Sequence, residues 1–262
     1  MKTVVITGGT RGIGHGLAES FLDLGCVVTI CGRSQTGVDQ AIASLAAEHR
    51  ASNILGRVCD VTDPMQVQAL WDAAKKQFGH VDIWINNAGI SHLQGALWEQ
   101  SPEQIAAVVS TNVIGLMYGT RTAIKGMLEQ GFGGLYNMEG LGSDGRKVEG
   151  LTLYGATKSA IRYLNDGLMR ETRGTPVLVG ALSPGMVVTD MILEQYKDRP
   201  QDWEQAARIF NLLADRVETV APWLAQKVLA NNKNGARISW LTRRKTIGRF
   251  ITAPFRKRDL FD

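Results

Sequence analysis

Short apolar runs alternate with amphipathic stretches along this chain, and this alternation limits the folds open to it more than any other feature. The runs Val4–Thr7 and Val27–Cys31 are strand-like, and between them Ile13–Leu24 carries apolar residues at helical spacing. The pattern repeats with strand-like runs at Ile54–Val58 and Val81–Ile85. Apolar strands separated by helices are typical of βαβ units, whose parallel sheet is buried on both faces. We therefore predict an α/β fold: a single doubly wound parallel sheet with helices on both faces.

The second half of the chain continues this pattern. Asp63 and Ser101 are each followed by proline, an N-cap signal that predicts helices ending near Phe78 and Gln130. Further strands are predicted at Leu135–Met138, Val177–Leu182 and Ala236–Leu241, and further helices at Leu153–Arg173 and over 190–231.

No composition break divides the chain, so we predict one domain over 1–242, with a substrate lid at about 186–215, followed by a basic C-terminal tail over 243–262. The last 27 residues hold eight of the 29 Lys and Arg residues and only two acidic residues, so this segment has a charge of +6 and the rest of the chain −2. A basic tail suits peripheral contact with an anionic membrane surface. A solvated terminal segment is the alternative interpretation, and no nucleic acid partner is expected.

Composition excludes several classes of protein. At 44% hydrophobic and 21% charged residues, the chain is neither disordered nor a small disulfide scaffold. The odd number of cysteines (Cys26, Cys31 and Cys59) predicts buried free thiols in a reducing compartment, and no metal-ligand spacing occurs. The first strand begins almost at Met1, and no apolar stretch approaches 18 residues. We therefore expect a soluble, cytoplasmic protein.

A glycine-rich turn, Thr7-Gly8-Gly9-Thr10-Arg11-Gly12-Ile13-Gly14, joins the first strand to the first helix. Its G-x-x-x-G-x-G spacing lets the chain turn sharply and brings backbone amides against a pyrophosphate at the helix N-terminus. The position between strand and helix gives this motif its weight, because a glycine-rich turn alone is weak evidence. The predicted cofactor-binding residues here are Gly8, Thr10, Arg11, Gly12, Ile13 and Gly14.

The end of the second strand distinguishes NADP(H) from NAD(H). NAD-binding proteins commonly place an acidic residue there for the ribose 2′-hydroxyl. This chain has Cys31-Gly32-Arg33-Ser34 instead. Arg33, together with Arg11, has the charge to bind a 2′-phosphate, so we predict NADP(H) as the cofactor. The alternative is that Arg33 is a solvated loop residue.

Two further strand ends carry residues suited to the cofactor. Asp60 and Val61 follow the third strand, where an adenine ring could lie. Asn87, Ala88 and Gly89 follow the fourth strand, and small residues there permit close approach to a cofactor while asparagine can tie neighbouring strand ends together.

Tyr154 and Lys158 lie four residues apart, so they share one face if this stretch is helical. A neighbouring ammonium and an oxidised nicotinamide both favour phenolate, so we expect a lowered pKa for Tyr154. Such a tyrosine exchanges a proton with a carbonyl or alcohol oxygen while hydride moves to or from the nicotinamide. A Tyr–Lys pair alone is more often surface packing than catalysis.

Together these motifs resemble the short-chain dehydrogenase/reductases, whose fold is Rossmann-like. The resemblance rests on TGGTRGIG, Asp60-Val61, NNAG, Asn112, YGATK and Ser183-Pro184-Gly185-Met186-Val187-Val188-Thr189, in the family's order over about residues 1–190. It implies that Tyr154 is the acid/base and that Lys158 holds the nicotinamide ribose. It also implies that Asn112 supports a proton-relay water and that Pro184, Gly185, Val187 and Thr189 line the nicotinamide. Relatives of this kind form homodimers or homotetramers.

One departure from the family pattern concerns the catalytic serine. The family places it about 13 residues before the tyrosine, where this chain has Leu141. Ser143 lies 11 residues before Tyr154, and it takes this role if the glycine-rich turn folds back. Otherwise the oxygen is stabilised by a backbone amide or a water, or chemistry is impaired.

The segment Asn137-Met138-Glu139-Gly140-Leu141-Gly142-Ser143 resembles the chlorophyll b reductase branch of the family, as does the basic C-terminal segment. The resemblance implies NADPH-dependent reduction of the 7-formyl group of chlorophyll b or chlorophyllide b to hydroxymethyl.

The substrate side leaves alternatives open. Met186–Phe210 is rich in apolar and aromatic residues, which suits a lid over a large hydrophobic substrate or a plain packed helix. His92 is a candidate substrate contact or, more commonly for a lone histidine, a satisfied loop residue. Two alternative functions are a reductase for another hydrophobic carbonyl or alcohol, and a catalytically silent NADP-binding module.

Overall fold

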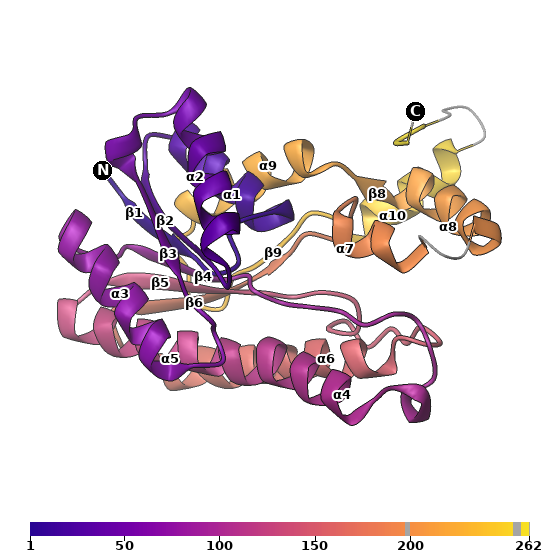
Figure 1. The fold of residues 1–262 in the computed structure, drawn as a ribbon, viewed down its shortest axis with the longest axis horizontal. Coiled ribbons are helices and arrows are strands. Elements are labelled where there is room, and N and C mark those ends of the chain that lie inside the picture. The colour runs from indigo at the N-terminus through magenta and orange to yellow at the C-terminus, as the bar shows by residue number, and fades with distance from the viewer. Residues whose placement is uncertain (197–199, 254–257, 262) are drawn as a thin grey trace.

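The computed structural model describes residues 1–196, 200–253 and 258–261, and its centre is a parallel sheet with strands in the order β3-β2-β1-β4-β5-β6-β9 (Figure 1). Every neighbouring pair in this sheet runs parallel. Its strands are β1(Thr3–Ile6), β2(Val27–Gly32), β3(Ile54–Val58), β4(Ile83–Asn86), β5(Gly133–Met138), β6(Val177–Ser183) and β9(Arg237–Ser239). The chain order reverses direction beside β1, which is the doubly wound arrangement that the sequence predicts.

Helices cover both faces of the sheet (Figure 1). One face carries α1(Gly12–Asp23), α2(Gln35–Glu48) and α9(Val217–Leu229). The other face carries α3(Pro64–Phe78), α4(Pro102–Val109), α5(Leu116–Gln130) and α6(Thr152–Glu171). Helices on both faces explain why the strands are apolar along their whole length, since neither face of the sheet meets water.

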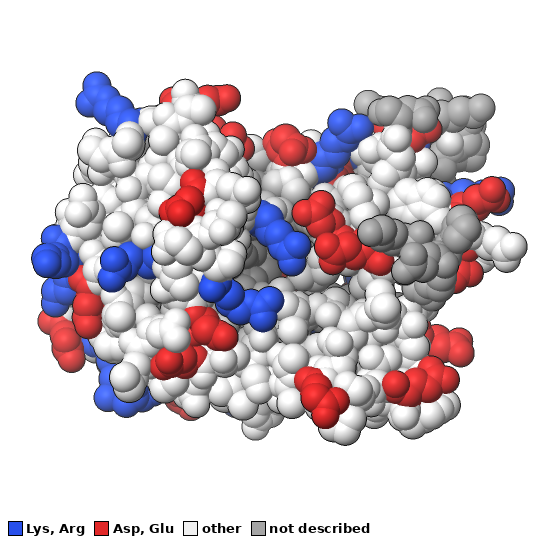
Figure 2. All heavy atoms as spheres, in the orientation of Figure 1, with Lys and Arg blue, Asp and Glu red and all other residues white. Residues whose placement is uncertain are grey.

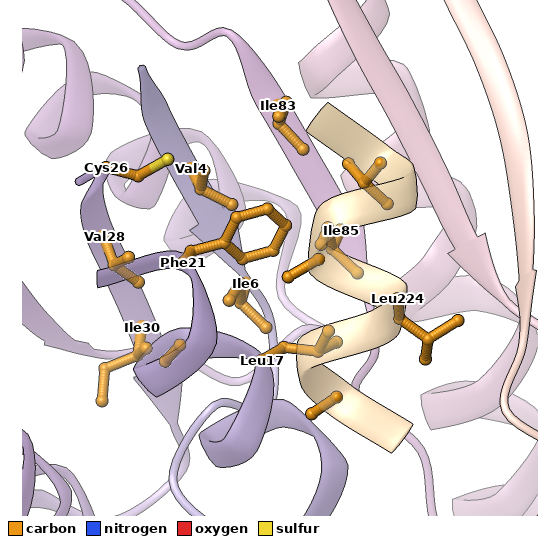
Figure 3. Close-up of a cluster of buried hydrophobic side chains, with 14 of the residues drawn as sticks. Val4, Ile6, Leu17, Phe21, Cys26, Val28, Ile30, Ile83, Ile85 and Leu224 are labelled. Carbon is orange, nitrogen blue, oxygen red and sulfur yellow. The ribbon is translucent and has the colours of Figure 1, made fainter. Parts of the chain in front are cut away.

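The core divides into two hydrophobic clusters, one on each face of the sheet. Val4 and Ile6 of β1 belong to one cluster, and Val5 between them belongs to the other, as the two-residue period of a strand requires. Figure 3 shows the first cluster, where Phe21 of α1 lies beside β1 and Leu224 projects from α9. Packing of the core therefore fixes the positions of the strand ends that carry the site.

The two predicted N-caps are present. The Asp63 side chain accepts a hydrogen bond from Met65 N at 2.8 Å, and Ser101 accepts one from Gln104 N at 3.1 Å. The second stretch, predicted as one long helix or a helix pair, is divided, because a π-helical turn, Ser110–Gly115, separates α4 from α5. This turn contains the candidate residue Asn112, and π-helical turns are frequent at functional sites.

The region predicted as helical over 190–231 contains a short sheet. Strands β7(Met186–Val187) and β8(Ala214–Asp215) pair in parallel, and between them lie α7(Asp190–Leu193), η4(Glu194–Tyr196) and α8(Pro200–Leu213). These helices stand apart from the main sheet (Figure 1), and we refer to this part of the chain, for which a substrate lid is predicted, as the lid. Its rings pack together, with the centroids of Trp203 and Phe210 6.0 Å apart. Periodicity within single segments does not reveal a strand of two residues, because its only partner is distant in the chain.

The C-terminal tail packs against this lid. Its helix α10(Arg243–Thr252) places Arg249 on the Asp215 carboxylate at 2.6 Å, and Arg258 reaches the same carboxylate at 2.7 Å. Trp240 donates to the same buried side chain. Part of the tail's charge is therefore internal to the fold, while Arg256 and Lys257 lie outside the described residues.

Among the described residues, no helix is long and apolar enough to cross a membrane, and no cluster of three or more His, Cys, Asp or Glu side chains could hold a metal ion. The three cysteines are free and buried.

Candidate active site

A cleft of about 1390 Å³ opens above the carboxyl ends of the central strands, between the sheet and the lid. Figure 2 shows a hollow near the middle of one face with basic side chains at its edge. The cleft brings together nearly all the residues predicted for cofactor binding and catalysis: Gly8, Thr10, Arg11, Gly12, Ile13, Gly14, Arg33, Ser34, Val61, Asn87, Ala88, Gly89, Ser143, Tyr154, Lys158, Pro184, Gly185, Val187 and Thr189. Two predicted residues, Asp60 and Asn112, do not line it.

The glycine turn is built for close approach. Gly8 has φ +64°, and a Cβ there would lie 2.8 Å from the Cα of Ala88. A Cβ on Gly14 would lie 2.3 Å from the carbonyl oxygen of Gly8, so that position admits only glycine. The Asn87 amide donates to the Gly8 carbonyl at 2.9 Å and ties β4 to the turn, as expected for an asparagine at this strand end.

The N-terminus of α1 faces the cleft with its first backbone amides uncapped by a side chain, since Arg11 at the N-cap forms no capping bond. Free amides at a helix N-terminus bind anions. The narrow turn and these amides therefore fit the pyrophosphate of a dinucleotide.

Arg33 follows β2 at one end of the cleft and has no ion-pair partner among the described residues. Arg11, at 63% side-chain exposure, makes only a long ion pair of 3.9 Å with Glu194. The Ser34 hydroxyl accepts from Gly37 N and caps α2, so its role is partly structural. The two guanidinium groups are thus accessible to a phosphate.

Asp60 supports a turn. Its carboxylate accepts hydrogen bonds from the backbone N and the hydroxyl of Thr62, at 2.9 and 2.8 Å. Its neighbour Val61 reaches the cleft in its place.

Tyr154 and Lys158 lie on one face of α6 and line the cleft floor, where Lys158 is buried and Tyr154 is half-buried. The Lys158 ammonium lies 5.6 Å from the centroid of the Tyr154 ring and donates to the Met138 carbonyl at 3.2 Å. Burial raises the pKa of Tyr154 to about 12 and lowers the pKa of Lys158 to about 8, the latter opposed by the charge of Glu139. The chain's own groups therefore shift the pKa of Tyr154 upward, opposite to the expected lowering, because loss of hydration disfavours the phenolate.

The chain that follows β5 packs closely against the Tyr–Lys pair. A Cβ on Gly140 would lie 2.8 Å from the Tyr154 hydroxyl and 3.1 Å from the Lys158 Cε. Any side chain at Gly140 would therefore displace the pair. Ser143 lies three residues on, is buried, and donates from its hydroxyl to the Gly140 carbonyl at 2.6 Å. The glycine-rich turn does fold back, and it places this hydroxyl on the wall of the same cleft.

Asn112 in the π-helical turn joins two walls of the site. Its amide oxygen accepts from Ile90 N at 2.8 Å, and its amide nitrogen donates to the Ile90 carbonyl and to the Thr157 hydroxyl at 2.9 and 3.1 Å. These bonds hold the loop after β4 against the helix that carries Tyr154. Asn112 is therefore a positioning residue in this structure.

His92 is a satisfied loop residue. One ring nitrogen bonds the Leu93 carbonyl at 2.7 Å, and the other accepts from Tyr154 N at 3.3 Å, which a single neutral tautomer allows. The ring helps to fix the start of α6.

Sequence reasoning missed the importance of Glu139 and Arg237. The Glu139 side chain is 2% exposed and is held by Arg237, with Nη2 to Oε1 at 2.9 Å and Nε to Oε2 at 3.1 Å. Glu139 and Arg237 stand about a hundred residues apart, so only the adjacent ends of β5 and β9 reveal the pair. The signal available in the sequence was a lone acid directly after an apolar strand.

The outer part of the cleft is apolar. Its walls there come from β7, α7 and α8 and include Met186, Ile192, Ile209, Phe210 and Leu213. The lid thus presents an apolar surface opposite the Tyr–Lys pair, as an apolar carbonyl compound would require.

A family model for short chain dehydrogenases matches residues 2–200. The chain belongs to this family. The assignment agrees with the fold and with the order of motifs along the cleft.

Similar proteins include two from rice, Oryza sativa subsp. japonica. Chlorophyll(ide) b reductase NOL, chloroplastic, is 39% identical over 87% of this chain, which covers 66% of that protein. A probable chloroplastic chlorophyll(ide) b reductase is 36% identical over the whole of this chain, which covers 54% of that protein. This short-chain dehydrogenase thus spans between about half and two thirds of their lengths. Their chloroplastic names do not support the expected cytoplasmic location.

Among solved structures, 3-ketoacyl-(acyl-carrier-protein) reductase from Brucella melitensis complexed with NADH has a TM-score of 0.80. It is 25% identical, and the alignment covers 93% of this short-chain dehydrogenase and 98% of that chain.

Proposed function

We propose that this chain is an NADPH-dependent carbonyl reductase that converts the 7-formyl group of chlorophyll b or chlorophyllide b to hydroxymethyl. The observation that carries the proposal is the Tyr154–Lys158 pair at the floor of a cleft whose outer wall is apolar. The similarity to the rice chlorophyll(ide) b reductases supports the choice of a pigment.

The chain's own groups suit the acid half of this reaction. Tyr154 donates its phenolic proton to the aldehyde oxygen, and the Ser143 hydroxyl, once it rotates away from the Gly140 carbonyl, stabilises that oxygen together with the neighbouring backbone. NADPH supplies the hydride when bound. Lys158 holds the nicotinamide ribose and returns the phenolate toward its protonated state. One hydride on carbon and one proton on oxygen make the alcohol.

Tyr154 is in the protonation state that carbonyl reduction needs. With a pKa near 12, the phenol is protonated at neutral pH, which is the state that a proton donor needs. Closure of the lid over an apolar substrate would keep that burial in place.

NADPH is proposed over NADH because Arg33 has no ion-pair partner among the described residues, Arg11 has only a long ion pair with Glu194, and no acidic residue follows β2. The turn over Gly8–Gly14 would hold the pyrophosphate. The Brucella relative was solved with NADH, so the choice rests on this chain's own arginines.

Arg33→Asp is expected to weaken NADPH binding by about 10²-fold or more and NADH binding by less than about three-fold, because a charge-assisted contact to the 2′-phosphate becomes a repulsion. Titration of cofactor fluorescence measures both dissociation constants. Arg50→Asp, outside the cleft, is the control for a general charge effect. Equal losses for the two cofactors would contradict a 2′-phosphate contact.

The kcat/KM of reduction is expected to fall as pH rises through about 8, because the Lys158 ammonium is lost there. Glu139→Gln removes a charge that favours the ammonium, so the midpoint of this fall moves to lower pH. Asp144→Asn, an exposed carboxylate on the same cleft, is expected to leave the midpoint in place. Pre-steady-state reduction across the pH range gives the midpoints, and an unshifted midpoint in Glu139→Gln would count against this role of its charge.

The decisive experiment is anaerobic incubation of the protein with NADPH and chlorophyll b or chlorophyllide b, followed by chromatography of the pigments. A hydroxymethyl product supports the proposal. A protein that binds NADPH but forms no product would favour the second candidate, a reductase for another hydrophobic carbonyl or alcohol, since an apolar lid accepts many such compounds. Assembly as a homodimer or homotetramer is part of the proposal and is measured by light scattering.

A further inference from the structure

Helix α10 presents an apolar stripe to solvent. Ile247, Phe250 and Ile251 are 59%, 57% and 68% exposed, and they lie at positions i, i+3 and i+4 on one helical face. Single exposed apolar residues are common on protein surfaces, whereas three on one face form a patch. The stripe follows a turn of three basic residues, Arg243 to Lys245.

The inward face of α10 is the polar one. Arg249 points toward the lid, where it binds the Asp215 carboxylate at 2.6 Å and the Leu213 carbonyl at 2.7 Å. The Lys245 ammonium lies over the ring of Trp240, 3.0 Å from its centroid. Surface helices ordinarily bury their apolar face and expose their charges. Because buried charge contacts fix α10 in the opposite orientation, the stripe is held outward by the fold.

Two arginines lie at the N-terminal end of the stripe. Arg243 and Arg244 on the first turn of α10 are exposed, and neither forms an ion pair with any residue in the described part of the chain. Arg243 also lines the cleft. The basic end of α10 therefore stands at the rim of the site, with the apolar stripe continuing from it.

We propose that α10 docks on the surface of a bilayer that contains anionic lipids, with the Ile247–Phe250–Ile251 stripe at the headgroup boundary and Arg243 and Arg244 against the lipid phosphates. Apolar residues beside arginines on one helix match a membrane surface in both polarity and charge. Docking in this way brings the rim of the cleft to the membrane.

A bilayer suits this face better than a second copy of the chain. Three side chains of this size offer a few hundred Å², well below the roughly 800 Å² per partner of a stable protein interface. Two copies that met through this face would also bring their Arg243 and Arg244 groups together. A further reason rests on the proposed function, since a pigment with a phytyl chain dissolves in membranes rather than in water.

The test is co-sedimentation of the full chain with phosphatidylcholine vesicles, with and without phosphatidylglycerol. We expect binding that needs the anionic lipid and weakens with salt. The Ile247→Ser/Phe250→Ser/Ile251→Ser variant is expected to lose at least about 30-fold in partition coefficient, given three apolar side chains withdrawn from the boundary. Met65→Ser, which removes an exposed apolar side chain from α3, is the matched control and should bind as wild type.

Arg243→Ala/Arg244→Ala tests the charge separately. Each arginine is expected to contribute about five-fold to binding of anionic vesicles. Lys75→Ala/Lys76→Ala, a pair of exposed lysines on α3, is the matched control and should change binding less than two-fold, about the resolution of such a comparison. Circular dichroism and thermal unfolding verify that each variant is folded.

Three outcomes would overturn the docking surface: no binding of wild type to anionic vesicles, equal binding by the triple serine variant, or conversion of a dimer to a monomer by that variant in sedimentation velocity. The last would assign the stripe to a second copy. Because the vesicles contain neither pigment nor cofactor, the result is independent of whether the chain reduces a chlorophyll.

Discussion

Tyr154→Phe is expected to lower kcat for carbonyl reduction by about 10²- to 10⁴-fold, the usual contribution of a general acid. The variant removes one oxygen from the ring and leaves the packing of α6 unchanged. NADPH should still bind within about two-fold of wild type, because Arg33 and the glycine turn are untouched. Single-turnover oxidation of NADPH, followed by absorbance, measures the rate of the chemical step.

Tyr163→Phe on the same helix is the matched control. Its ring is 84% exposed and lies outside the cleft, so kcat should stay at the wild-type value. If Tyr154→Phe kept full activity, Tyr154 would not be the acid. If the wild type bound NADPH and reduced no carbonyl compound, the catalytically silent NADP-binding module would be the better description.

Arg237→Met is expected to lower the free energy of unfolding by about 3–5 kcal/mol, the cost of leaving a buried charge without its partner. The Glu139 carboxylate is almost completely buried, and its remaining side-chain contact, from Asn165, is long at 3.5 Å. Urea unfolding followed by fluorescence measures the change.

The double variant Arg237→Met/Glu139→Gln should recover part of that loss, because a neutral amide costs less to bury than an unpaired carboxylate. Arg146→Met breaks an exposed ion pair with Asp144 and should cost less than about 1 kcal/mol. A loss in Arg237→Met no larger than that of Arg146→Met would show that the buried pair contributes little to stability.

Local sequence patterns predicted most of the elements that hold the site. The apolar strands, the two proline-marked N-caps and the glycine turn each depend on neighbouring residues, so a reading of the chain finds them. The glycine spacing also predicted a sharp turn with close backbone approaches. The structure has such a turn, because a Cβ on Gly14 would meet the Gly8 carbonyl. The order of the motifs along the chain was enough to indicate the family.

Other features depended on residues far apart in the chain. The pairing of Glu139 with Arg237 joins β5 to β9, and no local pattern connects them. The two-stranded sheet of β7 and β8 is equally non-local. The inward orientation of Arg249 on α10 likewise depends on the distant Asp215 carboxylate, which it contacts.

The sequence by itself determined the parallel sheet, the dinucleotide-type glycine turn and the Tyr154–Lys158 pair, because strand apolarity, glycine conformations and helical spacing are set within a few residues. Only the tertiary structure decided the protonation of that pair, since burial, which raises the pKa of Tyr154, is a property of the surrounding fold. The packing of distant segments likewise makes Gly140 leave room for the tyrosine hydroxyl, and it turns Arg249 of α10 inward and Ile247, Phe250 and Ile251 outward. These outcomes depend on which distant surfaces meet, and a one-dimensional pattern does not specify those contacts.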